Sequence, residues 1–261
     1  MKVFLLFILL FSVGFAQSRF VKTNDPNNPT VEHVHCVTMP KGGTHLLISL
    51  MERIAKELGV DVSSTHKNAL YTNTHTMNIS KNPQNFTAPR KIILIRDPRD
   101  ATVSAIDRMN KVVESGEMDN TWYLRNWPRL TYQQKIYTFL YEPHARGLHA
   151  FEWMTIEKVY FGNPEYLMVR FEDLVGAKGG GSDERQLFAI QSVLDYMRIN
   201  FSNETVKKIA SEIWGPHYYT FNKGVIGRYK IMLTEPAVKQ MINDRLGEMI
   251  IRFGYAKDLN W

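Results

Sequence analysis

The sequence predicts a single-domain α/β fold in which a parallel sheet is flanked by helices. Segments 91–95 and 166–171 are continuous apolar runs, a pattern typical of parallel strands that are buried on both faces. Longer segments with the apolar period of helices separate the strands, and strands that alternate with helices build parallel sheets. No repeat or linker divides the chain. We therefore expect one domain over residues 31–261.

The first strand is expected at 31–39 and the first helix from residue 44. Residues 31–39 are rich in β-branched side chains, and a proline and two glycines in 40–43 end the strand. The following apolar residues recur on one helical face: Leu46, Leu47, Leu50, Met51, Ile54 and Leu58. Gly59 then acts as a helix stop signal. The predicted order is strand, glycine-containing loop and helix.

The remaining elements are predicted from the same two patterns, continuous apolar runs for strands and apolar residues at the helical period for helices. Further strands are expected at about 69–74, 91–95 and 166–171. Helices are expected from residue 101 and over 131–160, 183–198, 203–213 and 236–253. Three consecutive glycines at 179–181 indicate a flexible loop between the last predicted strand and the helix after it.

The composition is that of an ordinary globular protein. The chain has 261 residues, of which 44% are hydrophobic and 22% charged, which excludes a collagen-like, coiled-coil or wholly disordered protein. With 32 Lys and Arg against 26 Asp and Glu, the net charge of +6 suits an anionic partner without identifying one. Cys36 is the single cysteine, so no internal disulfide can form. Its apolar strand predicts a core position rather than a nucleophile.

Residues 1–16 have the features of a cleaved signal peptide. Lys2 gives a basic start, residues 3–11 are apolar, and Gly14 and Ala16 are small residues at positions −3 and −1 of the expected cleavage site. The apolar run is shorter than the roughly 17–25 residues of a transmembrane helix, and an uncleaved anchor is the alternative. We therefore predict an exported protein, whether secreted, periplasmic or in the Golgi lumen.

The segment that follows the signal peptide predicts a flexible leader. Residues 17–30 are polar and interrupted by prolines, as surface segments are. No later segment is long and apolar enough to cross a bilayer, so we expect no stable membrane span after signal cleavage.

The loop between the first strand and helix has the chemistry of a phosphate cradle. Gly42 and Gly43 permit close backbone approach, and the helix N-terminus offers N–H groups and the positive end of its dipole. Lys41 adds a positive charge and Thr44 a hydroxyl group. In the nucleotide-kinase pattern G-x-x-x-x-G-K-[ST] the lysine follows the glycines, whereas Lys41 precedes them. This order argues against a kinase.

Two further segments suit the binding of anions. Arg96 ends a buried strand and Ser104 follows eight residues later on the next helix, so the pair predicts a second phosphate site. Ligands of open α/β sheets bind beyond the carboxyl ends of the strands, where both motifs are expected. Segment 221–230 contains two glycines and three cations, which suits a loop that covers an anion.

Together these motifs resemble those of sulfotransferases that use 3′-phosphoadenosine 5′-phosphosulfate (PAPS). Pro-Lys-Gly-Gly-Thr at 40–44 resembles the family's 5′-phosphosulfate loop, and Ile-Arg-Asp-Pro-Arg-Asp-Ala-Thr-Val-Ser at 95–104 resembles its 3′-phosphate motif. Segment 223–230 resembles Lys-Gly-x-x-Gly-x-Trp-Lys, with Tyr229 in place of Trp. Phe-Glu-Asp-Leu at 171–174 is similar to the family's Tyr-Glu-Asp-Leu. The resemblance covers nearly the whole mature chain and implies a P-loop NTPase-like three-layer fold.

The resemblance also implies which residues bind the donor. Around the 5′-phosphosulfate it places Lys41, Gly42, Gly43, Thr44 and His45. Around the 3′-phosphate it places Arg96, Ser104, Lys223 and Gly224. Phe171 and Trp214 are candidates for packing on adenine, because Leu46 stands where cytosolic members often have Trp.

Sulfuryl transfer needs positive charge on the bridging oxygen and a base for the acceptor's proton. Lys41 suits the first role. Asn-Thr-His at 73–75 resembles the Lys-Thr-His of cytosolic members, so His75 is the predicted base. The ordinary pKa of a histidine side chain, about 6.5, suits a base at neutral pH. Carbohydrate sulfotransferases use a Glu instead, for which Glu52 or Glu57 is the alternative. The histidines lack metal-ligand spacing, and we expect no metal.

The predicted activity is transfer of a sulfuryl group from PAPS to an acceptor hydroxyl or amine, which releases adenosine 3′,5′-bisphosphate. A carbohydrate and a small alcohol or phenol stay open as acceptors, and no nucleic-acid partner is expected. One alternative is a non-catalytic PAPS-binding or nucleotide-binding module, which the departures at Leu46, Asn73 and Tyr229 keep open. Another is a nucleotide kinase of the same fold.

Overall fold

The computed structural model describes residues 20–60, 62, 70–75, 90–116, 125–142, 150, 153–154, 158, 160–215 and 223–261. Its centre is a parallel sheet of four strands in the order β4–β3–β5–β6. The strands are β3 (Val34–Thr38), β4 (Tyr71–His75), β5 (Arg90–Ile95) and β6 (Tyr166–Arg170). The predicted α/β class with a parallel sheet is thus confirmed.

The two faces of the sheet pack into two different cores, because successive side chains of a strand point to opposite faces. One core joins Cys36 and Leu94 to the three helices α1 (Thr44–Glu57), α8 (Asp183–Met197) and α9 (Asn203–Glu212). The other joins Val37 and Ile93 to α3 (Pro98–Glu114), α5 (Tyr132–Tyr141) and α11 (Pro236–Arg252). Cys36 is fully buried, as its apolar strand predicts.

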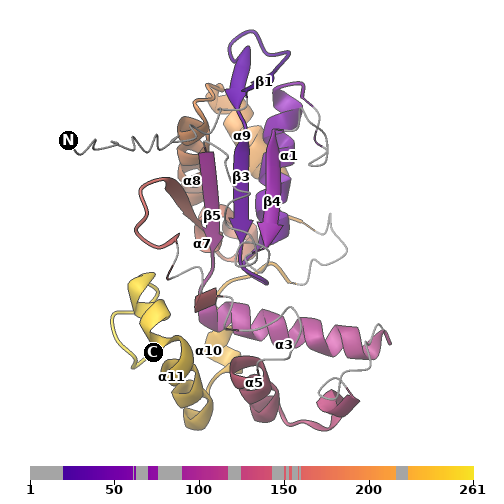
Figure 1. Cartoon of the computed structure of the whole chain (residues 1–261), viewed down its shortest axis with the longest axis vertical. Helices are drawn as coiled ribbons and strands as arrows, with labels where there is room; N and C mark the ends of the chain where they lie inside the picture. Colours follow the sequence, from indigo (N-terminus) through magenta and orange to yellow (C-terminus); the bar gives the residue numbers. More distant parts are fainter. Residues whose placement is uncertain are drawn as a thin grey trace, which may run out of the picture.

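The helices divide into two groups along the long axis of the molecule (Figure 1). Helices α1, α8 and α9 lie alongside the strands. Helices α3, α5 and α11 gather beyond the carboxyl ends of the strands, together with the short α10 (Tyr229–Met232). The carboxyl ends of the strands therefore point toward this second group of helices (Figure 1).

Most predicted elements are present, with some shifted ends. Helix α3 begins at Pro98 rather than near residue 101, because the Asp97 side chain accepts a hydrogen bond from the Arg99 backbone N–H and caps the helix. Strand β6 ends at Arg170, and Phe171 begins the short helix α7 (Phe171–Leu174). Helix α5 ends at Tyr141, so the helix expected over 131–160 is not continuous.

A β-hairpin replaces most of the expected flexible leader over 17–30. Strands β1 (Phe20–Lys22) and β2 (Thr30–Glu32) pair antiparallel, and Val21 is buried. Asn28 donates its side-chain N–H to the carbonyl of Asn200 and accepts from the Asn200 N–H, which fixes the hairpin to the end of α8. The folded domain therefore includes residues 20–30. The signal peptide predicted at 1–16 lies outside the described residues and stays a prediction.

From residue 20 onward, the described helices are all too short or too polar to cross a bilayer.

The loop between β3 and α1 depends on glycine for its close approach to β5 and α7. Gly43 has φ +105°, a left-handed conformation that side chains disfavour. A Cβ atom at this position would lie 2.4 Å from Phe171 Cδ2 and 3.0 Å from Leu94 Cδ2. Both contacts are with buried side chains that cannot move aside, so glycine lets the loop lie directly on the end of the sheet.

We expect Gly43→Ala to lower the free energy of unfolding more than Gly116→Ala does. Both glycines have positive φ, but a Cβ at Gly116 would meet nothing within 4 Å. Gly116→Ala therefore measures backbone strain of about 1 kcal/mol, whereas Gly43→Ala adds overpacking of about 1–3 kcal/mol. Urea denaturation of both variants makes the comparison. Equal losses would show that the loop does not pack as described.

Candidate functional site

Three segments meet at the carboxyl edge of the sheet around the side chain of Arg96. The loop 39–43 follows β3, Arg96 follows β5, and the loop 223–228 precedes α10. Arg96 donates from Nη1 to the carbonyl of Lys41 at 3.3 Å and from Nη2 to the carbonyl of Val225 at 3.1 Å. One guanidinium thus connects the two loops for which the sequence predicts anion binding.

Arg96 is buried, and its Nε has no partner among the described residues. The side chain is 6% exposed, and its Cζ lies 4.2 Å from the centre of the Phe171 ring. Burial lowers the pKa of the guanidinium, while Asp100 and Glu172 act in the opposite direction. Its Nε makes no hydrogen bond with any of the described residues. A buried N–H without a partner is costly, so the part of the chain that the structure describes leaves room for a further acceptor here.

Lys41 lies in the same positive environment. The residue has φ +62°, an uncommon conformation for a residue other than glycine, and such strain is typical of functional loops. Burial lowers the pKa of its ammonium group to about 8, and the charges of Arg108, Arg96 and Lys111 add to the shift. Positive charge has thus been concentrated here beyond what the nearby carboxylate of Asp107 balances, and an anion would relieve the repulsion.

Helix α1 begins at this loop and contributes its N-terminus. Gly43 is the N-cap residue, and no acidic side chain occupies the first turn. The hydroxyl groups of Thr38 and Thr44 lie 2.8 Å apart and hydrogen bond, which fixes the helix start to the end of β3. Thr44 is buried and the next residue, His45, is half-buried. The first-turn N–H groups and the dipole therefore face the loop that carries Lys41.

The loop 223–230 is held in place by hydrogen bonds to its backbone. Both carboxylate oxygens of Asp100 are used: Oδ2 accepts from Gly227 N at 2.6 Å and Oδ1 from Tyr229 N at 2.9 Å. Trp214 Nε1 donates to the carbonyl of Gly224 at 3.0 Å. The N–H of Ile226 donates to the carbonyl of Gly179 at 3.0 Å. The loop is therefore docked against α3 on one side and against the segments that contain Gly179 and Trp214 on the other.

A second set of charged groups supports the turn that carries Arg96. Arg99 pairs with Asp97 at 2.7 Å, and its Cζ lies 4.0 Å from the centre of the Tyr229 ring. Glu172 accepts from the Asp97 N–H and from the Tyr255 hydroxyl, each at 2.9 Å. Burial raises the pKa of Glu172 to about 6, although these hydrogen bonds favour its charged form. These contacts orient the turn.

The structure brings Lys41, Gly43, Arg96, Phe171 and Gly224 together through the contacts above. Ser104 is buried on α3, eight residues beyond Arg96 as predicted, and Lys223 is exposed at the start of its loop. Trp214 contacts the backbone of the loop 223–230. Gly42 is buried in the β3–α1 loop, and its N–H donates to the carbonyl of Met39.

His75 is the last residue of β4 and pairs in register with Thr38. Its backbone therefore lies at the same edge of the sheet as the β3–α1 loop, while its side chain is outside what the structure describes. Glu57, an alternative base, is at the far end of α1 and pairs with Lys208 at 2.7 Å, so it is not part of the site. Glu52 lies on the same helix, between its N-terminus and Glu57. Its charge adds to the burial that raises the pKa of Tyr71.

Two structural roles were not predicted. Asp100 belongs to the segment 95–104 that resembles the 3′-phosphate motif, and the sequence gives it no partner, yet it fixes the loop 223–230 over 127 residues of sequence. Trp153 Nε1 donates to the carbonyl of Pro40 at 3.1 Å, from 113 residues away. The buried position of Asp100 is the signal that sequence reasoning lacked, since a capping Asp is normally exposed. For Trp153 the sequence contains no local signal.

Asp100→Asn is expected to release the loop 223–230. The amide keeps one acceptor oxygen but turns an NH₂ group toward the second backbone N–H, which removes a charge-assisted hydrogen bond worth about 1.5–3 kcal/mol. Trypsin cleavage after Lys223, Arg228 or Lys230 should become about tenfold faster, because a decrease of about 1.4 kcal/mol in the free energy of loop opening makes the open form tenfold more populated. Asp258→Asn, at an exposed Asp away from the loop, is the control. Unchanged cleavage would contradict the anchoring role.

Comparison with known proteins identifies the fold. No protein-family model and no curated protein sequence matches this chain. Among solved structures, the mouse sulfotransferase SULT7A1 complexed with PAP is similar to it, with a TM-score of 0.55 and 15% sequence identity over 85% of this chain and 86% of that chain. The likeness confirms the predicted P-loop NTPase-like α/β fold, in the form that a sulfotransferase has. At this identity it shows the fold alone.

Proposed function

We propose that the protein is a sulfotransferase that moves a sulfuryl group from PAPS to a hydroxyl or amine of an acceptor. The observation that carries the proposal is the position of Arg96. Its guanidinium connects the β3–α1 loop to the loop 223–230 and keeps a buried Nε donor without a partner among the described residues. A donor with phosphate groups at both its 3′ and 5′ positions suits two such loops at one edge of the sheet.

The residues present fit this donor. Lys41, Gly42, Gly43, Thr44 and His45 would hold the 5′-phosphosulfate at the N-terminus of α1. Arg96, Ser104, Lys223 and Gly224 would hold the 3′-phosphate. Phe171 and Trp214 would pack on adenine. The ring of Phe171 already stacks on the guanidinium of Arg96, so it forms a flat wall beside the phosphate site.

The chemistry assigns separate roles to Lys41 and His75. In the reaction the acceptor oxygen or nitrogen bonds to sulfur while the bond from sulfur to the bridging oxygen breaks, and adenosine 3′,5′-bisphosphate leaves. Lys41 stabilises the negative charge that develops on the bridging oxygen. His75 takes the acceptor's proton, and its backbone position at the end of β4 supports this role. Among the described residues no His, Cys, Asp and Glu cluster could hold a metal ion.

A non-catalytic nucleotide-binding module is the second candidate. Asn73 stands two residues before His75, where cytosolic sulfotransferases have a lysine. Its Oδ1 is buried without a partner among the described residues. The substitution removes a cation from the region of transfer while the phosphate loops remain. This candidate shares donor binding with the enzyme and differs only in turnover.

Isothermal titration with adenosine 3′,5′-bisphosphate tests the site directly, with ATP as the comparison. We expect the bisphosphate to bind at least tenfold more tightly than ATP, because only the bisphosphate has a 3′-phosphate for Arg96. Arg96→Ala should weaken the bisphosphate at least a hundredfold, since the loss of a buried charge-assisted pair costs about 3 kcal/mol or more. Arg198→Ala, at an exposed arginine, is the control. Failure of the bisphosphate to bind would overturn the assignment.

The two candidates separate in a transfer assay with labelled PAPS and a panel of carbohydrates, alcohols and phenols. An enzyme transfers label to at least one acceptor class, and His75→Ala abolishes transfer while bisphosphate binding persists. Lys41→Ala abolishes transfer as well and, because its charge is lost, also weakens the binding of the bisphosphate. A binding module retains the bisphosphate and transfers nothing. Localisation in an exported compartment is proposed together with the enzyme, because residues 1–16 predict it.

The affinity for the bisphosphate is expected to fall as the pH rises above about 8. The pKa of Lys41 is lowered to about 8, so the free site loses its positive charge as the pH passes that value. A bound phosphate favours the ammonium form, and binding at pH 8.5 should therefore take up protons. Titrations in buffers of different ionisation enthalpy measure that uptake. Lys41→Arg stays charged and should show none; equal uptake in both proteins would contradict the role of Lys41.

A further inference from the structure

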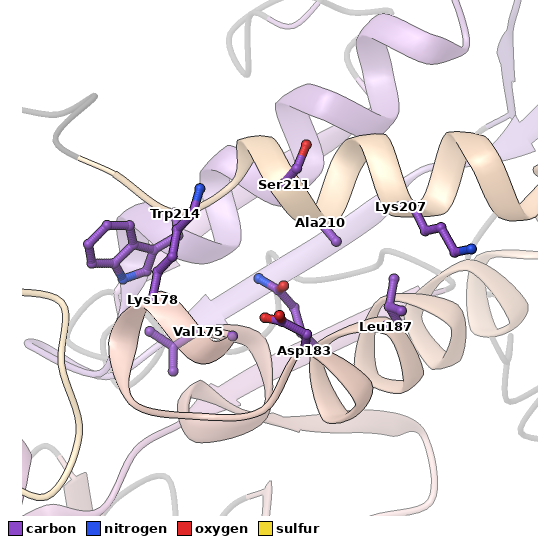
Figure 2. A pocket seen from close by; sticks show the side chains of 10 residues that line it. Val175, Lys178, Asp183, Leu187, Lys207, Ala210, Ser211 and Trp214 are labelled. Carbon is purple, nitrogen blue, oxygen red and sulfur yellow. The ribbon is translucent and has the colours of Figure 1, made fainter.

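A pocket of about 260 Å³ lies between α8, α9 and the segment that follows α7 (Figure 2). Val175, Leu187, Ala210 and the Trp214 ring supply its apolar lining. Figure 2 shows Lys178 and Trp214 at one end of the pocket and Leu187 and Lys207 toward the other. The pocket is slightly smaller than the roughly 300 Å³ at which drug-sized sites begin, so it suits a ligand of one aromatic ring with a small substituent.

Of the residues proposed to bind the donor, the lining of this pocket includes Trp214 alone. Its lining contains no residue of the β3–α1 loop, nor Arg96, Ser104 or Phe171. On α9 it uses Lys207, Ala210 and Ser211, whereas Glu212 of the same helix pairs with Arg53 on α1. Trp214 is the residue that connects the two places, because it lines the pocket and donates to the Gly224 carbonyl.

The polar groups of the pocket favour an anion. Asp183 and Gln186 are committed to the protein: Asp183 accepts from the Ala177 N–H, and Gln186 donates to the carbonyl of Leu174. Lys178 and Lys207 come from different segments and are both exposed, so the lining has two lysines and one carboxylate. The lining therefore has a net positive charge, apolar walls and an indole ring, which together suit a small aromatic monoanion.

The pocket also shares its walls with the supports of the loop 223–230. Gly179, one residue after Lys178, accepts from the Ile226 N–H, and a Cβ on Gly179 would lie 2.6 Å from the Gly224 carbonyl oxygen. Trp214 Nε1 donates to the same carbonyl. A ligand that packs on Trp214 and Lys178 would immobilise both supports, and fewer openings of the loop would follow.

We propose that this pocket is an effector site for a small aromatic monoanion, and that its occupancy stabilises the docked position of the loop 223–230. The binding site stands on the pocket alone. An effect on donor affinity would rest in addition on the proposed function, since that function places Lys223 and Gly224 at the 3′-phosphate.

Benzenesulfonate is the probe, and neither of its two measurements needs a nucleotide. Calorimetric titration of the full chain measures binding, and hydrogen exchange measures protection of the amides of Ile226, Gly227 and Tyr229. Leu187→Trp fills the pocket, and the double variant Lys178→Glu with Lys207→Glu reverses its charge. Lys257→Glu, at an exposed lysine outside the pocket, is the matched control for charge.

The proposal requires saturable binding of one benzenesulfonate, at least tenfold weaker in Leu187→Trp and in the double lysine variant but unchanged in Lys257→Glu. It also requires at least threefold slower exchange of the three loop amides when the probe is bound. Absence of binding, or equal binding in the pocket-filled variant, would overturn the site. Binding with unchanged loop exchange would overturn the coupling. Neither result bears on whether the bisphosphate binds, so the two proposals fail separately.

Discussion

The buried guanidinium of Arg96 is the contact on which the arrangement of the site depends. Three of its features act together: it directly follows β5, it donates to the carbonyls of Lys41 and Val225, and it stacks on Phe171. Burying a charge is costly, and Asp100 and Glu172 offset part of that cost. Lys41 lies in the same environment: burial is the main cause of its lowered pKa, and the charges of Arg108 and Arg96 add to it. An anion at this edge would relieve that repulsion.

The acidic residues around this centre act on position rather than on the ligand. Asp97 caps α3 and pairs with Arg99, while Glu172 accepts from the turn at the N–H of Asp97. Both carboxylate oxygens of Asp100 accept hydrogen bonds from backbone N–H groups of the loop 223–230. Each carboxylate thus fixes a backbone segment that carries a cation or a glycine of the site. These contacts hold the backbone that positions the cations, while Asp100 and Glu172 offset only part of the charge of Arg96.

Local patterns predicted the fold, and long-range contacts account for the features they missed. Apolar runs and helical periods located the sheet strands and the helices α1, α8, α9 and α11 to within a few residues, since both depend on neighbours in sequence. The hairpin β1–β2 was missed because Val21 gains its burial only through pairing with Val31. The predicted site residues Lys41 and Arg96 do come together, since Arg96 donates to the Lys41 carbonyl. The anchoring role of Asp100, in contrast, requires a partner more than a hundred residues away.

The fold alone does not choose between sulfuryl transfer and other uses of phosphate loops, because one α/β scaffold supports many chemistries. The choice rests on where the cations stand. Lys41 precedes its glycines and bends the backbone through a positive φ, which turns its carbonyl toward Arg96. The backbone of Lys41 is thereby hydrogen-bonded to Arg96, which follows the neighbouring strand β5, so both residues lie at one edge of the sheet. A kinase loop, with its lysine inside the helix start, lacks this link. Two anionic groups on a single nucleotide would suit two cations at one edge, and β4 brings the backbone of His75, which we propose as the base, to the same edge.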